Sequence, residues 1–124
     1  MRSIFLLLGS LSACSGVAMG AFGAHGLKGV IAPNLLAAYQ TGVSYQMWHA
    51  LGLCVIALIE RQAGKSKALS SAGFLMFAGI VLFSGSLYLL ALSGLKWPGM
   101  ITPFGGLSFL AAWLLLAYFA ARRT

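Results

Sequence analysis

The chain has 124 residues, of which 60% are hydrophobic and only 7% charged, and its formal net charge is +7. Soluble domains carry about 25% charged residues, and a short chain cannot bury so many apolar side chains in one aqueous core. The composition therefore excludes an ordinary soluble domain and predicts a membrane protein. The basic residues lie between apolar runs, which indicates membrane topology and lipid headgroups as their role and excludes nucleic acid as a partner.

The first apolar segment covers residues 3–24 and is rich in small residues. Four of them follow one another at four-residue spacing, namely Ser12, Gly16, Gly20 and Ala24. In a helix they share a face on which another backbone can approach closely. A competing interpretation is a lipoprotein signal peptide cleaved before Cys14. Because the apolar run continues beyond Cys14 to the length of about 20 residues that a span needs, we predict an uncleaved helix.

The second apolar segment begins after a helix start signal, since Pro33 cannot lie inside a helix and Asn34 is a good N-cap. A helix from here to Glu60 is longer than a membrane needs, so we expect the span itself to cover residues 42–59. A short charged loop follows, with Glu60, Arg61, Lys65 and Lys67.

Two further spans are predicted at residues 71–92 and 103–121, separated by a turn at residues 96–99. Thr102 before Pro103 predicts the start of the last helix through a hydroxyl cap. Short connections make consecutive helices antiparallel neighbours. We therefore predict an all-α membrane protein, a single domain over residues 1–124 with four transmembrane helices in an antiparallel up-down bundle.

The distribution of basic residues predicts the orientation of this bundle. With the N-terminus inside, the inner ends hold Arg2, Arg61, Lys65, Lys67, Arg122 and Arg123, and the outer ends hold Lys28 and Lys96. An excess of basic residues marks the cytoplasmic side. Both termini are expected in the cytoplasm, and the protein is expected in the bacterial inner membrane.

In this orientation most uncharged polar side chains fall in the outer half of the bundle. The predicted polar site consists of His25, Tyr45, Gln46, His49, Ser84, Ser86, Tyr88 and Thr102. Tyr39, Gln46 and His49 share one helix face, and polar groups in lipid should face the bundle interior. One interpretation is interhelical hydrogen bonding to hydroxyls or carbonyls. The other is a small-ligand or proton site, because ionisable groups inside membranes often serve function.

Cofactor and enzyme hypotheses find less support in the sequence. Two histidines on neighbouring helices are compatible with haem or metal ligation. However, His49 lies about 10 Å deeper than His25 by the helical rise per residue, and further ligands are missing. A nucleophile–base pair such as Ser84 and His49 lacks an orienting carboxylate, since Glu60 lies at the opposite membrane face. We predict no cofactor, no metal and no enzymatic activity, and keep haem as a minor alternative.

Four segments carry a family resemblance: GAFGAHGL at residues 20–27, TGVSYQMWHALGL at 41–53, LFSGSLYLLAL at 82–92 and TPFGG at 102–106. Together they resemble the YgdD/YwdK family of small bacterial inner-membrane proteins of unknown function, which has transmembrane protein 256 as a mitochondrial relative. The resemblance implies four spans and an uncleaved first helix, and it implies no activity, ligand or catalytic residue.

Two classes of function therefore follow from the sequence. The first is a small interaction or accessory subunit that packs into a homo-oligomer or a larger membrane complex through the face of Ser12, Gly16 and Gly20. The second is a carrier or binder of a small ligand or proton, which uses Gln46 and His49 in the outer half of the bundle. We rank the first ahead because four helices leave little room for alternating access, which usually needs paired repeats.

Overall fold

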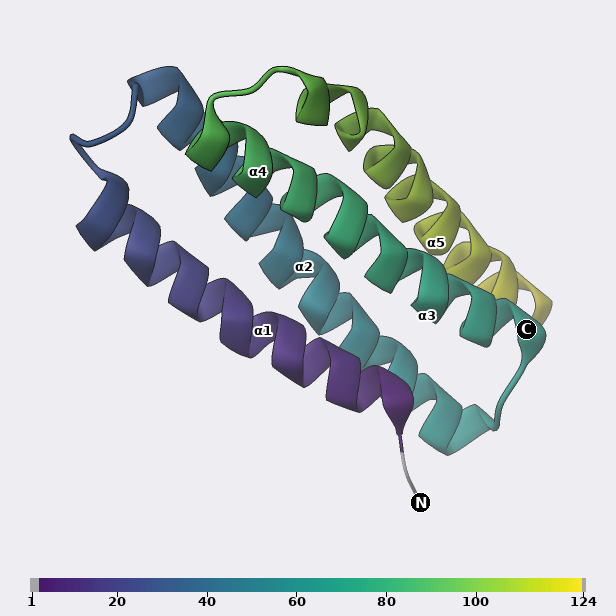
Figure 1. The fold of residues 1–124 in the computed structure, drawn as a ribbon. Helices are drawn as coiled ribbons and strands as arrows, with labels where there is room; N and C mark the ends of the chain where they lie inside the picture. The colour runs from purple at the N-terminus through teal and green to yellow at the C-terminus, as the bar shows by residue number, and fades with distance from the viewer. Residues whose placement is uncertain (1–2, 124) are drawn as a thin grey trace.

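The computed structural model describes residues 3–123, and this part of the chain consists of helices and short connections without a strand. The helices join into four long rods, which lie side by side (Figure 1). The first is α1 (Ile4–Phe22), extended by the π-turn η1 (Gly23–Leu27), and the second is α2 (Pro33–Ala63). The third joins α3 (Lys67–Gly79), the π-turn η2 (Ile80–Ser84) and α4 (Gly85–Ser93). A 3-10 turn, η3 (Trp97–Met100), leads into the last helix, α5 (Thr102–Arg123).

All four rods are long and apolar enough to cross a membrane, which confirms the predicted number of spans. Their candidate spans cover 24, 31, 27 and 26 residues. They exceed the expected spans of residues 3–24, 42–59, 71–92 and 103–121 because the helices continue beyond the apolar windows. In particular, α2 is one continuous helix from Pro33 to Ala63.

Serine side chains cap the N-terminal ends of two helices. The Ser3 hydroxyl caps α1 by accepting from the Leu6 backbone N–H at 3.2 Å, and the Ser66 hydroxyl caps α3 in the same way. Two expected caps were wrong. Pro33 is itself the first residue of α2, so Asn34 lies inside the helix. Thr102 is already helical, and its hydroxyl contacts the Pro98 carbonyl at 3.4 Å instead of capping α5.

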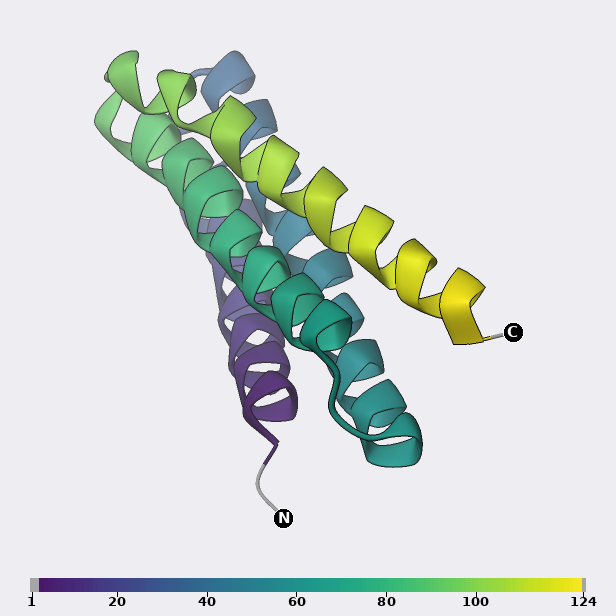
Figure 2. The same ribbon diagram turned by 90° about the vertical axis from the view of Figure 1, so that its right-hand side faces the viewer.

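The rods alternate in direction, and each packs on its neighbour in the chain. α1 packs mainly on α2, α2 packs on all parts of the third rod, and α5 packs on α3 and η2. The 90° view in Figure 2 shows α1 and α5 on opposite sides of the molecule. The bundle is therefore open: α2 and the third rod form its centre, while α1 and α5 flank it and leave most of their surface to lipid.

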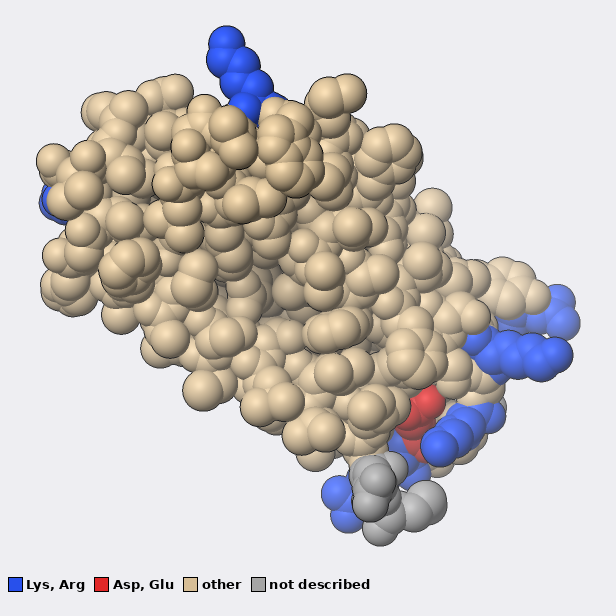
Figure 3. All heavy atoms as spheres, in the orientation of Figure 1, with Lys and Arg blue, Asp and Glu red and all other residues tan. Residues whose placement is uncertain are grey.

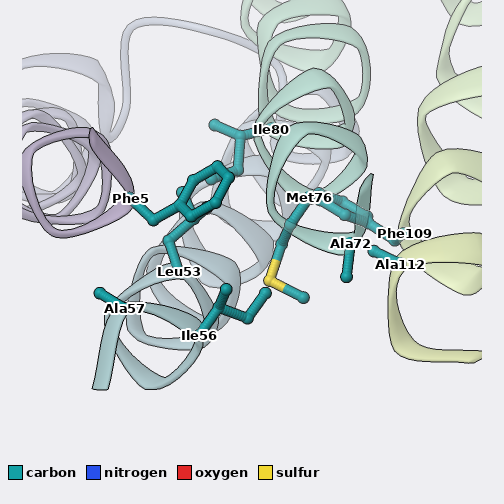
Figure 4. Packing of buried hydrophobic residues seen from close by; sticks show 9 residues of the cluster. All are labelled: Phe5, Leu53, Ile56, Ala57, Ala72, Met76, Ile80, Phe109 and Ala112. Atoms are coloured by element: carbon teal, nitrogen blue, oxygen red, sulfur yellow. The ribbon is translucent and has the colours of Figure 1, made fainter. Parts of the chain in front are cut away.

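The apolar core lies between α2, α3 and α5, with one large contribution from α1. Figure 4 shows Phe5 of α1 reaching toward Leu53 and Ile80, while Phe109 enters from α5. Glycines make this packing possible, since a Cβ at Gly73 would overlap the Phe5 ring and one at Gly79 would overlap the Phe109 ring. A second, smaller cluster of Leu27, Tyr39 and Ala91 closes the opposite end.

Basic residues gather at one end of the bundle. Arg61, Lys65 and Lys67 flank the α2–α3 connection, and the last turn of α5 with Arg122 lies at the same end. Figure 3 shows that most blue basic side chains of this view gather at the end that carries the red acidic side chain, with isolated basic side chains elsewhere. The two others of the described chain, Lys28 and Lys96, belong to the connections at the opposite end.

Candidate functional site

The candidate site is centred on two polar residues of α2 that lie one turn apart. Gln46 and His49 are each 5% exposed, and Tyr39 and Leu53 on the same face are fully buried. The prediction that this face points into the bundle is therefore confirmed. Its cause is the cost of polar groups in lipid, which favours interior positions where partners exist.

Gln46 joins three helices through its amide. Its Nε2 donates to the Ser12 carbonyl of α1 and to the Ser15 hydroxyl, both at 2.8 Å, and its Oε1 accepts from the Tyr88 hydroxyl of α4 at 2.6 Å. The carbonyl of Ser12 can only accept, which fixes the orientation of the amide. Both amide hydrogens are thereby used inside the protein.

His49 is satisfied on both ring nitrogens by protein groups. The Trp113 indole N–H of α5 donates to Nε2 at 3.0 Å, and Nδ1 lies 2.6 Å from the Tyr45 carbonyl. An indole nitrogen only donates and a carbonyl only accepts. Nε2 must therefore be the acceptor and Nδ1 the donor, so the arrangement requires the neutral imidazole with its proton on Nδ1. The ring also stacks on Phe109, with 3.5 Å between the ring centroids.

The hydroxyl groups of the predicted site form separate pairs. Ser84 donates to the Gly42 carbonyl across helices at 2.6 Å, and Ser86 lies 2.5 Å from the Thr102 hydroxyl. The Ser86 hydroxyl also donates to the Phe83 carbonyl of the same rod, a frequent arrangement for serine in membrane helices. In the described chain, every buried side-chain nitrogen or oxygen has a hydrogen-bond partner.

The eight residues of the predicted site thus do not converge on one place. Gln46 contacts α1 and Tyr88 of α4, Tyr45 and His49 face α5, and the serines join α2 or α5 to the third rod. His25 is exposed in the π-turn at the end of the first rod and lies outside these bonds. The structure therefore divides the outer half into several interhelical contacts.

Sequence reasoning missed the aromatic partners of His49, above all Trp113 and Phe109. A signal existed, because Trp113 lies in the middle of the last span, away from the interfaces where tryptophan is enriched. A tryptophan N–H in an apolar environment usually has an acceptor, and His49 is the buried acceptor on the neighbouring helix.

The small-residue face of α1 is used within the chain. Ser12 and Gly16 are buried against α2, where a Cβ at Gly16 would clash with the side chain of Met47. Ala24 is exposed, and its inclusion in this face was wrong. Four-residue steps drift by about 40° each on a helix of 3.6 residues per turn, so Gly23 takes the place expected for Ala24 and lies against Tyr39.

A groove runs along the lipid-facing side of His49 and its partners Phe109 and Trp113, between α2, η2 and α5. We call it the α2–α5 groove. Its volume is about 620 Å³, and it is lined by Tyr45, His49, Phe83, Pro103, Gly106, Leu107, Phe109, Leu110 and Trp113. All of these side chains are apolar or aromatic except for His49, whose nitrogens are already bonded. The groove therefore suits an apolar occupant.

The described residues do not form a set of ligands for haem or a metal around His49. Among the described residues no three His, Cys, Asp or Glu side chains form a cluster that could hold a metal ion. His49 could act as an axial ligand only after its Nε2 loses the Trp113 bond. His25 lies at the end of another rod and does not share a site with it.

Four apolar spans joined by interhelical hydrogen bonds define a small polytopic α-helical membrane protein. The chain belongs to the family described as "Protein of unknown function (DUF423)", whose model matches residues 19–106. It is 45% identical to the UPF0382 membrane protein YwdK of Bacillus subtilis, over 96% of this chain and 97% of the relative. It is 46% identical to a UPF0382 membrane protein of Staphylococcus haemolyticus, over 91% of each. These relatives confirm the family resemblance. No solved structure matches the chain.

Proposed function

We propose that this protein is a non-enzymatic assembly subunit of the membrane and that it pairs with a second copy of itself through the α2–α5 groove. The observation that carries the proposal is the position of this groove beside an apolar ridge on the same helix. The ridge consists of Leu114 and Tyr118, which share a helix face with the groove residue Leu107 and are 69% and 56% exposed.

Adjacent ridge and groove make this face self-complementary. In a two-fold dimer the ridge of one copy meets the groove of the other, and the reverse contact follows by symmetry. Gly106 in the groove lets the backbone of a second helix approach, since the nearest atom to a Cβ placed there would be 4.0 Å away. The small-residue face of α1 does not serve this role because α2 covers it.

The carrier hypothesis receives less support from the same site. A carrier needs polar groups that exchange protein partners for ligand, whereas Gln46 and His49 already hold three and two protein partners. Protonation of His49 at Nε2 would place two N–H groups against each other. The nucleophile–base pair considered for an enzyme, Ser84 and His49, is likewise already bonded to protein groups, so we favour assembly.

Cysteine cross-linking in isolated membranes tests the pairing. In a background with Cys14 and Cys54 replaced by alanine, Leu114→Cys is expected to give an oxidised dimer on gels. Val17→Cys is the matched control, because Val17 is 63% exposed on α1 and far from the groove. Gly106→Leu fills the groove and should abolish the Leu114→Cys dimer. Equal cross-linking at both positions, or none, would contradict the proposal.

We further propose that the protein lies in the cytoplasmic membrane with both termini in the cytoplasm. The support is the gathering of basic side chains at the end that holds the α2–α3 connection, with only Lys28 and Lys96 of the described chain at the other. Reporters active on one side of the membrane, fused to each terminus, test this. A C-terminal fusion active outside the cytoplasm would refute it.

A further inference from the structure

A second cavity lies at the basic end of the bundle, far from the α2–α5 groove. It has a volume of about 1040 Å³ and is bounded by the first turn of α1, the last turns of α2 and the beginning of α3. We define it as the basic-end cavity. Neither the polar site of α2 nor the proposed dimer face uses it.

The wall of this cavity toward the bilayer is apolar and exposed. Leu6 of α1, Leu58 of α2 and Phe74 of α3 line it and are 47%, 58% and 55% exposed. They lie within the candidate spans of the three rods. In a membrane such a wall contacts hydrocarbon, and the cavity gives one chain a defined place between three helices.

The rim of the cavity toward the membrane surface is polar and predominantly basic. Arg61 and Lys65 are exposed there, and Glu60 is the only acidic residue of the whole chain. Gly64 has a positive φ of 85°, which ends α2 and turns the chain toward Lys65 and Ser66. Basic pockets between membrane helices at this level recognise anionic lipid headgroups.

From this juxtaposition we propose that the basic-end cavity binds an anionic phospholipid, with its phosphate at Arg61 and Lys65 and an acyl chain along Leu6, Leu58 and Phe74. Arginine and lysine both donate hydrogen bonds to phosphate oxygens. The occupant must combine negative charge with a long apolar chain, because the rim and the wall belong to one cavity. Lipid binding in this cavity does not require two copies of the protein to pair.

Native mass spectrometry of the full chain in a mild detergent tests the proposal. Dioleoylphosphatidylglycerol is the anionic probe, and dioleoylphosphatidylcholine is the zwitterionic probe with the same acyl chains. We expect the anionic lipid to bind at least about tenfold more tightly, given the contribution of each basic residue near a lipid surface. Equal affinity for the two lipids would overturn the proposal.

Charge variants locate the headgroup. Arg61→Gln combined with Lys65→Gln should weaken binding of the anionic lipid by about 30-fold, and Glu60→Gln should strengthen it by about fivefold. The matched control removes the same charge at the other end, by Lys28→Gln with Lys96→Gln, and should leave the affinity unchanged. A similar loss in the control would show unspecific charge attraction and overturn the site.

A third comparison separates a lipid site from an anion site. Leu58→Ala should weaken lipid binding about threefold through the lost apolar contact, whereas Leu51→Ala, with the same 58% exposure outside the cavity, should not. Inorganic phosphate at millimolar concentration should fail to displace the lipid. Displacement by phosphate, or an unchanged affinity in Leu58→Ala, would contradict an acyl-chain site. Helix content by circular dichroism verifies that each variant folds.

Discussion

Gln46 and His49 lie one turn apart on the same buried face, yet their surroundings differ in kind. Gln46 is enclosed between α1 and α4, and its three partners come from these two helices on the closed side of the bundle. His49 is held by α5, and its partner Trp113 is 42% exposed at the edge of the α2–α5 groove. A step of three residues on α2 therefore separates a sealed structural contact from one that borders lipid.

This difference shows how a membrane bundle distributes its polar groups. Interhelical hydrogen bonds contribute about 0.6 kcal/mol each, so a residue with three bonds can fix the register of three helices. A residue with one interhelical bond at an open edge instead positions an aromatic surface. Among the polar contacts, we therefore expect those of the closed side to contribute more to folding stability, whereas the open side presents the surface for association.

The largest effect is expected where α5 meets η2 on the open side. A Cβ at Gly105 would overlap the backbone of Phe83, so Gly105→Ala must push α5 away. Overpacking costs about 3 kcal/mol in such contacts. The difference in the free energy of unfolding between variant and wild type, in mixed micelles, measures this cost. Gly85→Ala is the control, since nothing lies within 4 Å of a Cβ there. Equal stability of the two variants would disprove this tight contact.

Removal of the Gln46 amide should have the next largest effect. Gln46→Leu deletes its three hydrogen bonds with Ser12, Ser15 and Tyr88, so we expect a loss of about 2 kcal/mol at the membrane value per bond. Tyr88→Phe removes one of the three and should cost about a third as much. The free energies of unfolding of both variants in the same micelles give the two losses. A cost for Gln46→Leu no larger than that for Tyr88→Phe would show that the network does not act as a unit.

The smallest effect is expected for the bond between Trp113 and His49. Trp113→Phe removes one hydrogen bond, worth about 0.6 kcal/mol, so stability alone resolves it poorly. The imidazole nitrogen shifts in ¹⁵N NMR give a direct measurement. The wild-type protein should show His49 protonated on Nδ1 alone. In Trp113→Phe the proton should stay on Nδ1, because the Tyr45 carbonyl still accepts from it, and only the Nε2 shift should change with the loss of its donor. A wild-type spectrum with the proton on Nε2 would contradict the geometry.

The sequence by itself determined that lipid surrounds this protein, how many spans it has and which face of α2 points inward. Each of these depends on local composition or on the 3.6-residue period, and both are visible in the chain. The charge asymmetry between its two sets of connections is likewise a property of the sequence, because it requires only the order of the spans.

The tertiary structure alone decided which polar groups meet. Depth along the membrane placed eight residues in the same half of the bundle, but depth does not give the rotation of each helix about its own axis. That rotation directs Gln46 toward Ser12 and His49 toward Trp113, and it leaves His25 exposed. It depends on side chains from distant segments, such as Phe5 against Gly73, and on the π-turns that shift the register. Such contacts are set by packing among all four rods, which no single stretch of sequence contains.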